Sequence, residues 1–168
     1  LANMRVPTVA AVNGVAAGAG ASLALACDMV LATESAAFLL PFAKIGLIPD
    51  TACSWLVPQR LGQARALGLA MTSQKLPAAK AAQWGLIWDA VANDAFAGAV
   101  DALAQQLAQM PTRALVRTRQ AMQAGRTNTL EQQLTLEGLY MRELGRSSDY
   151  VEGVAAFLEK RAPRFTGA

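Results

Sequence analysis

The sequence predicts an α/β fold in its first half, followed by a set of amphipathic helices. Short apolar runs that are typical of buried strands alternate with helical segments up to about residue 94, and this alternation favours parallel strand pairing. After that point the apolar residues recur at helical spacing and the charge density rises. We therefore divide the chain into a core of residues 1–94 and a helical region of residues 95–168.

Composition and charge indicate a folded protein and argue against nucleic-acid-binding and membrane-spanning proteins. Apolar residues make up 54% of the 168 residues and charged residues only 16%, which is typical of a folded chain. The net charge is +3 and the basic residues form no runs, so nucleic acid is not an expected partner. No apolar run reaches the roughly 20 residues that a membrane span needs, and the first residues do not resemble a signal peptide.

The chain contains two cysteines and no histidine. Cys27 and Cys53 both lie in apolar stretches and form no Cys-x-x-Cys pair, so we expect buried free thiols in a reducing cytoplasm. Without histidine or a cysteine pair, a zinc site is not expected, and we assign no metal ligands.

The expected core elements follow in chain order. Apolar runs that read as strands lie at 8–12, 29–32 and 86–91, with a further run at 36–42. A helix begins in or just after the pair Gly18 and Gly20. Residues 46–50 form a loop that leads into another helix, and residues 78–84 form a short helix that ends at Gly85.

The helical region carries its own boundary signals. Apolar residues recur from Val100 until Pro111 stops the helix, and the next helix ends at Gly125. Asn128 with Glu131, and Asp149 with Glu152, resemble capping-box starts. The apolar stripes of these helices need a partner, which is either the first lobe or another subunit.

Three carboxylates lie in the first 88 residues, namely Asp28, Glu34 and Asp50. We expect Asp28 to be a hydrogen-bonded turn carboxylate and Glu34 to be solvated. Asp50 follows Pro49 at the head of a helix, where aspartate often serves as the N-cap. The alternative is a carboxylate in apolar surroundings, where desolvation suits a base that takes up and returns a proton near neutral pH.

The stretch Gly18-Ala19-Gly20 has three interpretations. The small residues permit close packing of a helix on a strand, which is the first expectation from these residues alone. A tight turn before a helix also leaves backbone N–H groups free to hold an oxyanion. A dinucleotide fingerprint is the weakest interpretation, because Leu23 stands where the third glycine belongs.

Taken together, these residues resemble the crotonase (enoyl-CoA hydratase/isomerase) superfamily. The similarity runs from Val6 to Phe165, and it rests on the segments 7–14, 18–20 with Cys27-Asp28, 44–50 and 149–161. The resemblance implies a core that is a spiral of ββα turns, followed by helices that mediate assembly into trimers or dimers of trimers. It also implies that the N-terminal part of the family domain is missing from this sequence.

The resemblance implies acyl-CoA thioester substrates and no separate cofactor, because coenzyme A is part of the substrate. Two backbone N–H groups stabilise an enolate in the family, and one of them matches Ala19, between Gly18 and Gly20. The other belongs to the missing segment, so a non-enzymatic alternative is an inactive fragment that acts only as an oligomerisation module. Phe157 and Lys160 match positions that contact the adenosine–phosphate part of CoA; the alternative is a core phenylalanine and a solvated lysine.

The resemblance also distinguishes isomerase from hydratase. The two glutamates of the family's hydratases are replaced here by Ser22 and Phe42, whereas its isomerases carry an acid at the position of Asp50. One carboxylate is enough to move a proton between two carbons, so we expect an isomerase, with an enoyl-CoA hydratase as the alternative. The segments 45–50 and 145–150 are similar to a subgroup that isomerises ring-1,2-epoxyphenylacetyl-CoA in bacterial phenylacetate degradation and shifts double bonds in enoyl-CoA chains.

Two features bear on the shape of the substrate. Trp55, Trp84 and Trp88 either line an aromatic pocket or, as tryptophans more often do, pack against the fold. Cys53 stands where the subgroup usually has glycine, which adds side-chain volume close to Asp50.

Overall fold

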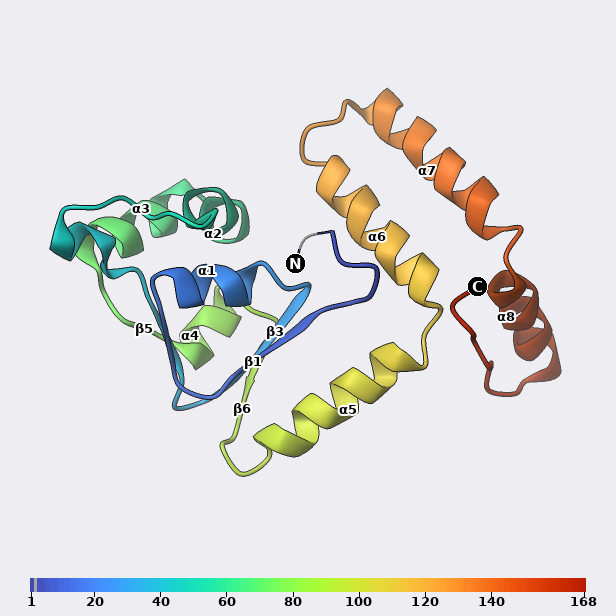
Figure 1. Cartoon of the computed structure of the whole chain (residues 1–168), viewed down its shortest axis with the longest axis horizontal. Coiled ribbons are helices and arrows are strands. Elements are labelled where there is room, and N and C mark those ends of the chain that lie inside the picture. The colour runs from blue at the N-terminus through green and yellow to red at the C-terminus, as the bar shows by residue number, and fades with distance from the viewer. Residues whose placement is uncertain (2) are drawn as a thin grey trace. The chain divides into compact units, whose positions relative to one another are not determined.

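The computed structural model describes residue 1 and residues 3–168 (Figure 1). The chain forms two compact units, of which the first contains residues 8–103 and the second contains residues 3–7 and 104–168. The functional division into a core of residues 1–94 and an oligomerisation region of residues 95–168 stays a prediction.

The first sheet of the first unit is entirely parallel. Its strands lie in the order β1-β3-β6, with bounds Val9–Val12, Met29–Thr33 and Asp89–Val91. Val9 pairs with Met29, and Leu31 pairs with Asp89 on the other side of β3. The parallel pairing predicted from the alternation of strands and helices is therefore confirmed for these strands.

The second sheet is mixed and its strands are very short. Its order is β2-β4-β5, with bounds Val15–Ala17, Ala37–Leu39 and Leu76–Pro77. β2 and β4 are parallel, whereas β4 and β5 are antiparallel. β2 and β5 were not predicted, because β2 runs directly into the small-residue stretch that leads to α1 and β5 has only two residues.

Four α-helices and a 3-10 helix lie wholly within the described part of the first unit. They are α1 (Ala19–Leu25), η1 (Pro41–Ile45), α2 (Cys53–Leu61), α3 (Gln63–Thr72) and α4 (Ala78–Gln83). The first helix starts inside the glycine pair, as predicted. The shared core buries Leu25, Val30 and Cys53 almost completely, with exposures of 1% each. Both cysteines are free thiols; Cys53 is buried as expected, but Cys27 is only half-buried.

A charged side chain ties two of these helices together. The Arg60 guanidinium on α2 donates hydrogen bonds to the carbonyl oxygens of Leu25 and Cys27, at the end of α1, and to that of Leu86. The last carbonyls of a helix lack partners within the helix, so this arginine satisfies acceptors that would otherwise be left open. Asp28 behaves as predicted, because its carboxylate accepts the backbone N–H and the hydroxyl of Thr8 at 2.8 and 3.0 Å.

The remaining chain is helical. Its helices are α5 (Phe96–Ala108), which crosses the boundary between the units, α6 (Thr112–Ala124), α7 (Leu130–Leu144) and α8 (Ser148–Glu159). The predicted stops at Pro111 and Gly125 are confirmed as the residues that flank α6. No helix in the part of the chain that the structure describes is both long and apolar enough to cross a membrane.

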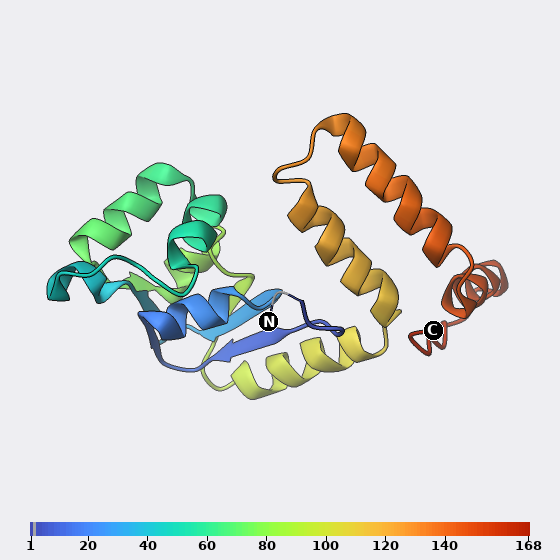
Figure 2. The same ribbon diagram turned by 45° about the horizontal axis from the view of Figure 1, so that its top comes forward.

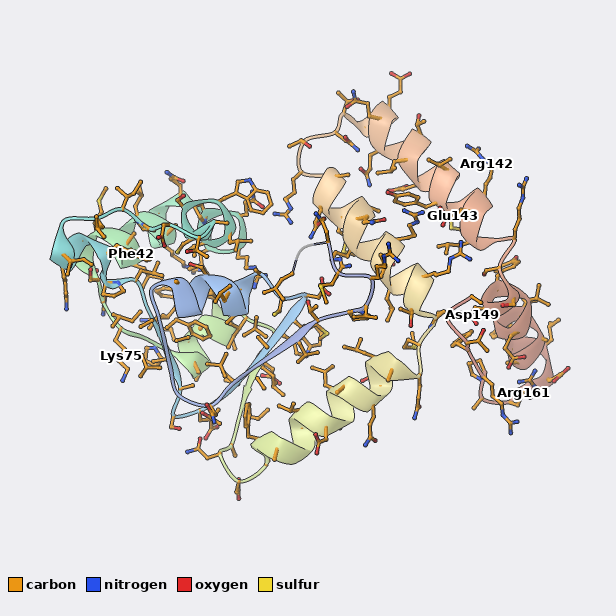
Figure 3. All side chains as sticks on the ribbon, viewed as in Figure 1. Phe42, Lys75, Arg142, Glu143, Asp149 and Arg161 are labelled. Carbon is orange, nitrogen blue, oxygen red and sulfur yellow. The ribbon has the colours of Figure 1, made fainter. Side chains whose placement is uncertain are left out.

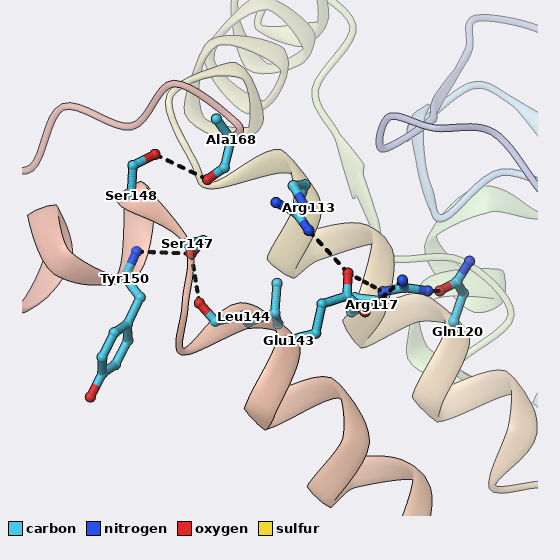
Figure 4. Close-up of polar contacts among 9 residues, drawn as sticks. All are labelled: Arg113, Arg117, Gln120, Glu143, Leu144, Ser147, Ser148, Tyr150 and Ala168. Atoms are coloured by element: carbon cyan, nitrogen blue, oxygen red, sulfur yellow. Dashed lines mark hydrogen bonds and ion pairs between the residues drawn. The ribbon is translucent and has the colours of Figure 1, made fainter.

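Helices α6 and α7 lie side by side in the second unit (Figures 1 and 2). Arg117 on α6 donates from Nη2 to Glu143 Oε2 on α7 at 2.6 Å, and Arg113 contacts the same carboxylate at 3.2 Å (Figure 4). The hydrogen bond from Arg117 is the main reason that the pKa of Glu143 lies below its ordinary value. The same guanidinium lies 4.6 Å from the centre of the Tyr140 ring, which favours a cation–π contact.

The predicted capping-box starts of α7 and α8 are wrong. A capping box does begin α7, but it is formed by Thr129 and Gln132, one residue further along than the pair Asn128 and Glu131. The N-cap of α8 is Ser147, whose hydroxyl accepts the N–H of Tyr150 (Figure 4). Aspartate, asparagine, serine and threonine all cap helices well, so composition alone does not fix which of several neighbours does so.

Asp149 and Glu152 instead hold the C-terminal tail against α8. The Asp149 carboxylate, 5% exposed, accepts the N–H groups of Thr166 and Gly167 at 2.7 and 2.9 Å. Glu152 binds Arg161 and accepts the N–H of Arg164 at 2.8 Å. Figure 3 shows Asp149 and Arg161 at α8 and the tail.

Candidate active site

A tight turn at Gly18 joins β2 to α1. Gly18 has φ 53° and ψ −124°, and its N–H donates to the carbonyl of Leu39 on β4 at 2.9 Å. A positive φ of this kind favours glycine, because any side chain would strain the backbone. A Cβ added here would lie 3.7 Å from the Phe42 ring, an ordinary contact, and one added at Gly20 would meet nothing within 4 Å. Close packing, the first expectation for this glycine pair, is therefore wrong.

The turn presents backbone donors. The N–H groups of Ala21 and Ser22 both donate to the Gly18 carbonyl, at 3.1 and 3.2 Å. Those of Ala19 and Gly20 come before the hydrogen-bonded ladder of the helix, and both residues are exposed. α1 has only seven residues, so the donors themselves, rather than a long helix dipole, make the turn suited to a negatively charged oxygen.

The loop around Asp50 has an unusual backbone. Thr51 and Ala52 both have left-handed conformations, with φ 52° and 62°, and Ala52 is the N-cap of α2. The interpretation of Asp50 as the N-cap is therefore wrong. Its carbonyl accepts the N–H of Cys53 at 2.8 Å and closes the turn. Two consecutive left-handed residues without glycine are costly, and such strain is typical of functional sites.

The Asp50 side chain lies at the surface of the described chain. It is exposed, and its Oδ1 accepts the Thr51 hydroxyl at 2.9 Å. The expectation of a carboxylate buried in apolar surroundings is therefore wrong for this chain. The apolar residues just before it, Leu47 and Ile48, are also exposed, at 60% and 80%, because the loop turns them outward together with the acid.

Ser22 connects the glycine turn with the Asp50 loop. Its side chain is fully buried, and its Oγ lies 3.4 Å from the carbonyl oxygens of both Gly18 and Asp50. Phe42, which is 8% exposed, packs close to the same turn. The structure therefore brings together Gly18, Ala19, Ser22, Phe42 and the main chain of Asp50, although these residues come from separate segments.

Cys53 adds a buried thiol next to this cluster. Burial raises the pKa of the Cys53 thiol, a hydrogen bond with Ser22 opposes that rise, and the charge of Asp50 adds to it. The thiol therefore stays protonated and acts as a small apolar side chain. It also lines a small apolar groove of about 140 Å³, whose other walls include Leu40, Pro49, Val57, Ala66 and Ala70. Sequence analysis did not predict this groove, because its walls come from three segments whose packing no local pattern specifies.

The predicted CoA-contacting residues belong to the second unit. Phe157 is 82% exposed, so the alternative of a core phenylalanine is wrong. Lys160 is exposed and ends α8 in a left-handed conformation. Phe157 also lines an apolar hollow of about 620 Å³ within this unit, together with Met141, Leu144, Val154 and Phe165.

The three tryptophans differ in their surroundings. Trp84 packs against the core, and the Arg65 guanidinium and the Lys80 ammonium lie 4.7 and 4.8 Å from its ring centre. Packing therefore accounts for Trp84. Trp55 and Trp88 are 52% and 66% exposed.

The fold is that of a crotonase-type α/β protein. The family model for enoyl-CoA hydratase/isomerase matches residues 1–168, and the chain belongs to this family. The fold agrees with solved structures: the enoyl-CoA hydratases of Polaromonas sp. JS666 and Bacillus anthracis superimpose with TM-scores of 0.93 and 0.94, at 34% and 29% identity. The alignments cover 98% and 99% of this chain and 64% and 65% of theirs.

The chain is also similar to curated proteins. It is 51% identical over 167 residues to the 1,2-epoxyphenylacetyl-CoA isomerase of Escherichia coli K12, covering 99% of this chain and 64% of that protein. It is 50% identical over 161 residues to a protein of Rhodobacter capsulatus named "Probable enoyl-CoA hydratase", covering 96% of this chain and 63% of that protein. The chain thus spans slightly less than two thirds of these relatives.

Proposed function

We propose that the protein is an acyl-CoA isomerase that moves a proton through the enolate of a CoA thioester, with Asp50 as the base. The observation that carries the proposal is that the Asp50 loop lies next to the Gly18 turn. The main chain of Asp50 is joined to this turn through Ser22, while the two positions at which the family's hydratases have glutamates hold Ser22 and Phe42. One acid at one oxyanion turn is the minimum that isomerisation needs.

Hydration makes a different demand on the site. One group must activate water and another must handle the proton at the α-carbon. Ser22 is fully buried and Phe42 has no titratable group, so neither activates water. Asp50 is then the single carboxylate of the cluster and serves both ends of a proton shift.

The proposed reaction conserves atoms and charge. The Asp50 carboxylate removes a proton from the α-carbon of a 3-enoyl-CoA, and the electron pair of that C–H bond moves to the thioester oxygen to form a dienolate. The Ala19 N–H, in the turn between Gly18 and Gly20, holds that oxyanion. The protonated Asp50 then returns the proton to the γ-carbon, the thioester carbonyl re-forms, and the double bond now lies between the α- and β-carbons. An epoxyphenylacetyl-CoA is the alternative substrate suggested by the 51% identical isomerase.

Binding of the substrate would also shield the Asp50 carboxylate from water, which the loop alone does not do. Asp50 is exposed here, and an acyl chain lying on the exposed side chains of Leu47 and Ile48 would exclude water from the carboxylate. At the other end of the substrate, the Phe157 ring suits stacking with adenine and the Lys160 ammonium suits a phosphate. Coenzyme A enters as part of the substrate, and we propose no separate cofactor.

We propose a cytoplasmic homo-oligomer, either a trimer or a dimer of trimers. The helical region supports this proposal through its large exposed apolar side chains, which are 58–82% exposed at Leu130, Leu134, Met141, Phe157 and Leu158. Apolar patches of this kind mark protein interaction surfaces. Neither membrane nor nucleic acid is a proposed partner.

The second candidate function is enoyl-CoA hydratase, which the 50% identical Rhodobacter protein favours by its name. The test gives full-length protein a 3-enoyl-CoA and, separately, crotonyl-CoA. We expect double-bond migration, and we expect water addition to be at least about 100-fold slower than migration. A missing acid–base group typically costs 10²–10⁴ in rate. Water addition as fast as migration would instead favour the hydratase.

A further inference from the structure

We infer that Ser22 is a positioning residue that fixes the Asp50 loop against the Gly18 turn, and so sets the separation between the proton-transferring acid and the oxyanion donor. The inference rests on the proposed function, because it assigns a role to a side chain that does not itself react. Its subject is a fully buried hydroxyl on α1, at a distance of 28 residues along the chain from Asp50.

The hydrogen bonds around Ser22 show what it connects. The Gly18 carbonyl accepts the N–H groups of Ala21 and Ser22, and the Ser22 hydroxyl lies 3.4 Å from it. The same hydroxyl lies 3.4 Å from the Asp50 carbonyl, which also accepts the N–H of Cys53. Because a hydroxyl has one proton, Ser22 shares it between an oxygen of the oxyanion turn and an oxygen of the acid's own residue.

The backbone after Asp50 has a conformation that needs support from its surroundings. Thr51 and Ala52 are left-handed, and such a conformation persists only where the surroundings over-determine it. At the Asp50 carbonyl, the Cys53 N–H comes from the same turn, whereas the Ser22 hydroxyl comes from another helix. Ser22 is therefore the contact at this oxygen that fixes the loop relative to the oxyanion turn, rather than only within itself.

The contact at the Asp50 carbonyl gives the inference a readout outside catalysis. The Cys53 N–H, at the start of α2, donates to the same carbonyl oxygen, so the Ser22 hydroxyl touches the oxygen that closes this turn. Its loss should loosen the turn that the Cys53 N–H closes. Hydrogen exchange of that amide measures the loosening directly, whether or not substrate is present.

The consequence for the reaction is geometric. Proton transfer needs the reacting atoms about 3 to 3.5 Å apart, and a displacement of about 1 Å costs up to about 100-fold in rate. Substrate binding depends mostly on surfaces that Ser22 does not touch. A residue with this role should therefore affect kcat and leave KM nearly unchanged.

The experiment uses Ser22→Ala and Ser22→Cys in the full-length protein, assayed for double-bond migration. We expect Ser22→Ala to lower kcat about tenfold with KM within about twofold, and to speed exchange of the Cys53 amide. Ser22→Cys keeps a weak donor of similar size and should recover part of the rate. The matched control is Ser73→Ala, because Ser73 is also buried and its hydroxyl has no hydrogen-bond partner in the described chain; its kcat should not change.

The inference is overturned if Ser22→Ala keeps the wild-type kcat, or if Ser73→Ala loses as much. A loss of activity that comes only from a raised KM would also overturn it. Asp50→Asn is assayed in parallel to separate the two proposals. An inactive Asp50→Asn beside a fully active Ser22→Ala refutes the role of Ser22 alone, whereas an active Asp50→Asn refutes the proposed function.

Discussion

The hydroxyl oxygen of Ser22 lies 3.4 Å from the main-chain carbonyl oxygen of Asp50. This contact joins two segments. One is the glycine turn, whose first N–H groups precede the helical ladder, and the other is the loop that carries the Asp50 carboxylate. The two parts of the proposed chemistry are therefore placed by one buried side chain, which stands where the family's hydratases have a glutamate.

Replacement of Gly18 by alanine should destabilise the fold through the backbone rather than through a clash. The added Cβ has room, 3.7 Å from Phe42, but φ 53° is unfavourable for any side chain. We expect a loss of about 1 to 2 kcal/mol in the free energy of unfolding, measured by denaturant titration. The control is Gly68→Ala, which adds a Cβ to open space inside α3 and should stabilise by up to about 1 kcal/mol.

Arg60 should prove important for stability despite lying outside the candidate site. Arg60→Met removes donors to three carbonyl oxygens, those of Leu25, Cys27 and Leu86. We expect a loss of about 2 kcal/mol or more, since hydrogen bonds from charged groups contribute about 1.5 to 3 kcal/mol. The measurement compares the thermal unfolding of Arg60→Met with that of Lys75→Met. Lys75 is an exposed cation on the same unit (Figure 3). Equal stability of the two variants would contradict the prediction.

The sequence alone was enough to predict the fold class, the parallel sheet, the start of α1 and the stops around α6. These features follow from long apolar runs and from glycine and proline, whose local effects are strong. The strands β2 and β5 were missed because their pairing depends on partners far along the chain. The cap of α8 was misplaced because Asp149 bonds the tail and leaves the N-cap to Ser147.

Part of the candidate site could likewise be predicted from the sequence and part could not. The turn at residues 18–20 follows from glycine chemistry, and the structure shows the expected turn and helix start. The exposure of Asp50 did not follow, because the left-handed Thr51 and Ala52 redirect the loop although neither is glycine. Nor did the bridging position of Ser22, which depends on a contact across 28 residues. The catalytic roles of Asp50 and Ala19 stay predictions.

The C-terminal tail should loosen at low pH. Hydrogen bonds from the Arg161 side chain and the Arg164 N–H lower the pKa of Glu152 to about 2. In the unfolded chain a glutamate titrates near about 4.3, so these bonds stabilise the tail fully above that pH and are lost as the pH falls through about 2. An NMR titration of the Arg164 amide should show a step near pH 2. Glu152→Gln is the control and should abolish that step; its persistence would show that another group is responsible.

Phe157 and Lys160 should affect binding of the nucleotide end of the substrate rather than the proton transfer. Both side chains are exposed, so Phe157→Ala and Lys160→Ala should fold normally. We expect each to raise KM about tenfold for the CoA thioester with kcat unchanged, because the contacts are made equally in the ground and transition states. The control is the corresponding pantetheine thioester, which lacks adenosine and should be converted equally by wild type and variants. An equal rise in KM for that truncated substrate would refute the role of both residues.

The most direct test of the account is the rate at which Asp50→Asn shifts the double bond of a 3-enoyl-CoA, measured on full-length protein. Glu34→Gln, which removes another exposed carboxylate from the first unit, is assayed beside it. The account predicts that Asp50→Asn loses about 10³-fold or more in kcat while keeping the wild-type melting temperature, because no other group in the cluster can carry the proton. The Glu34→Gln variant should match wild type. An Asp50→Asn variant that turns over within a few-fold of wild type would contradict the account.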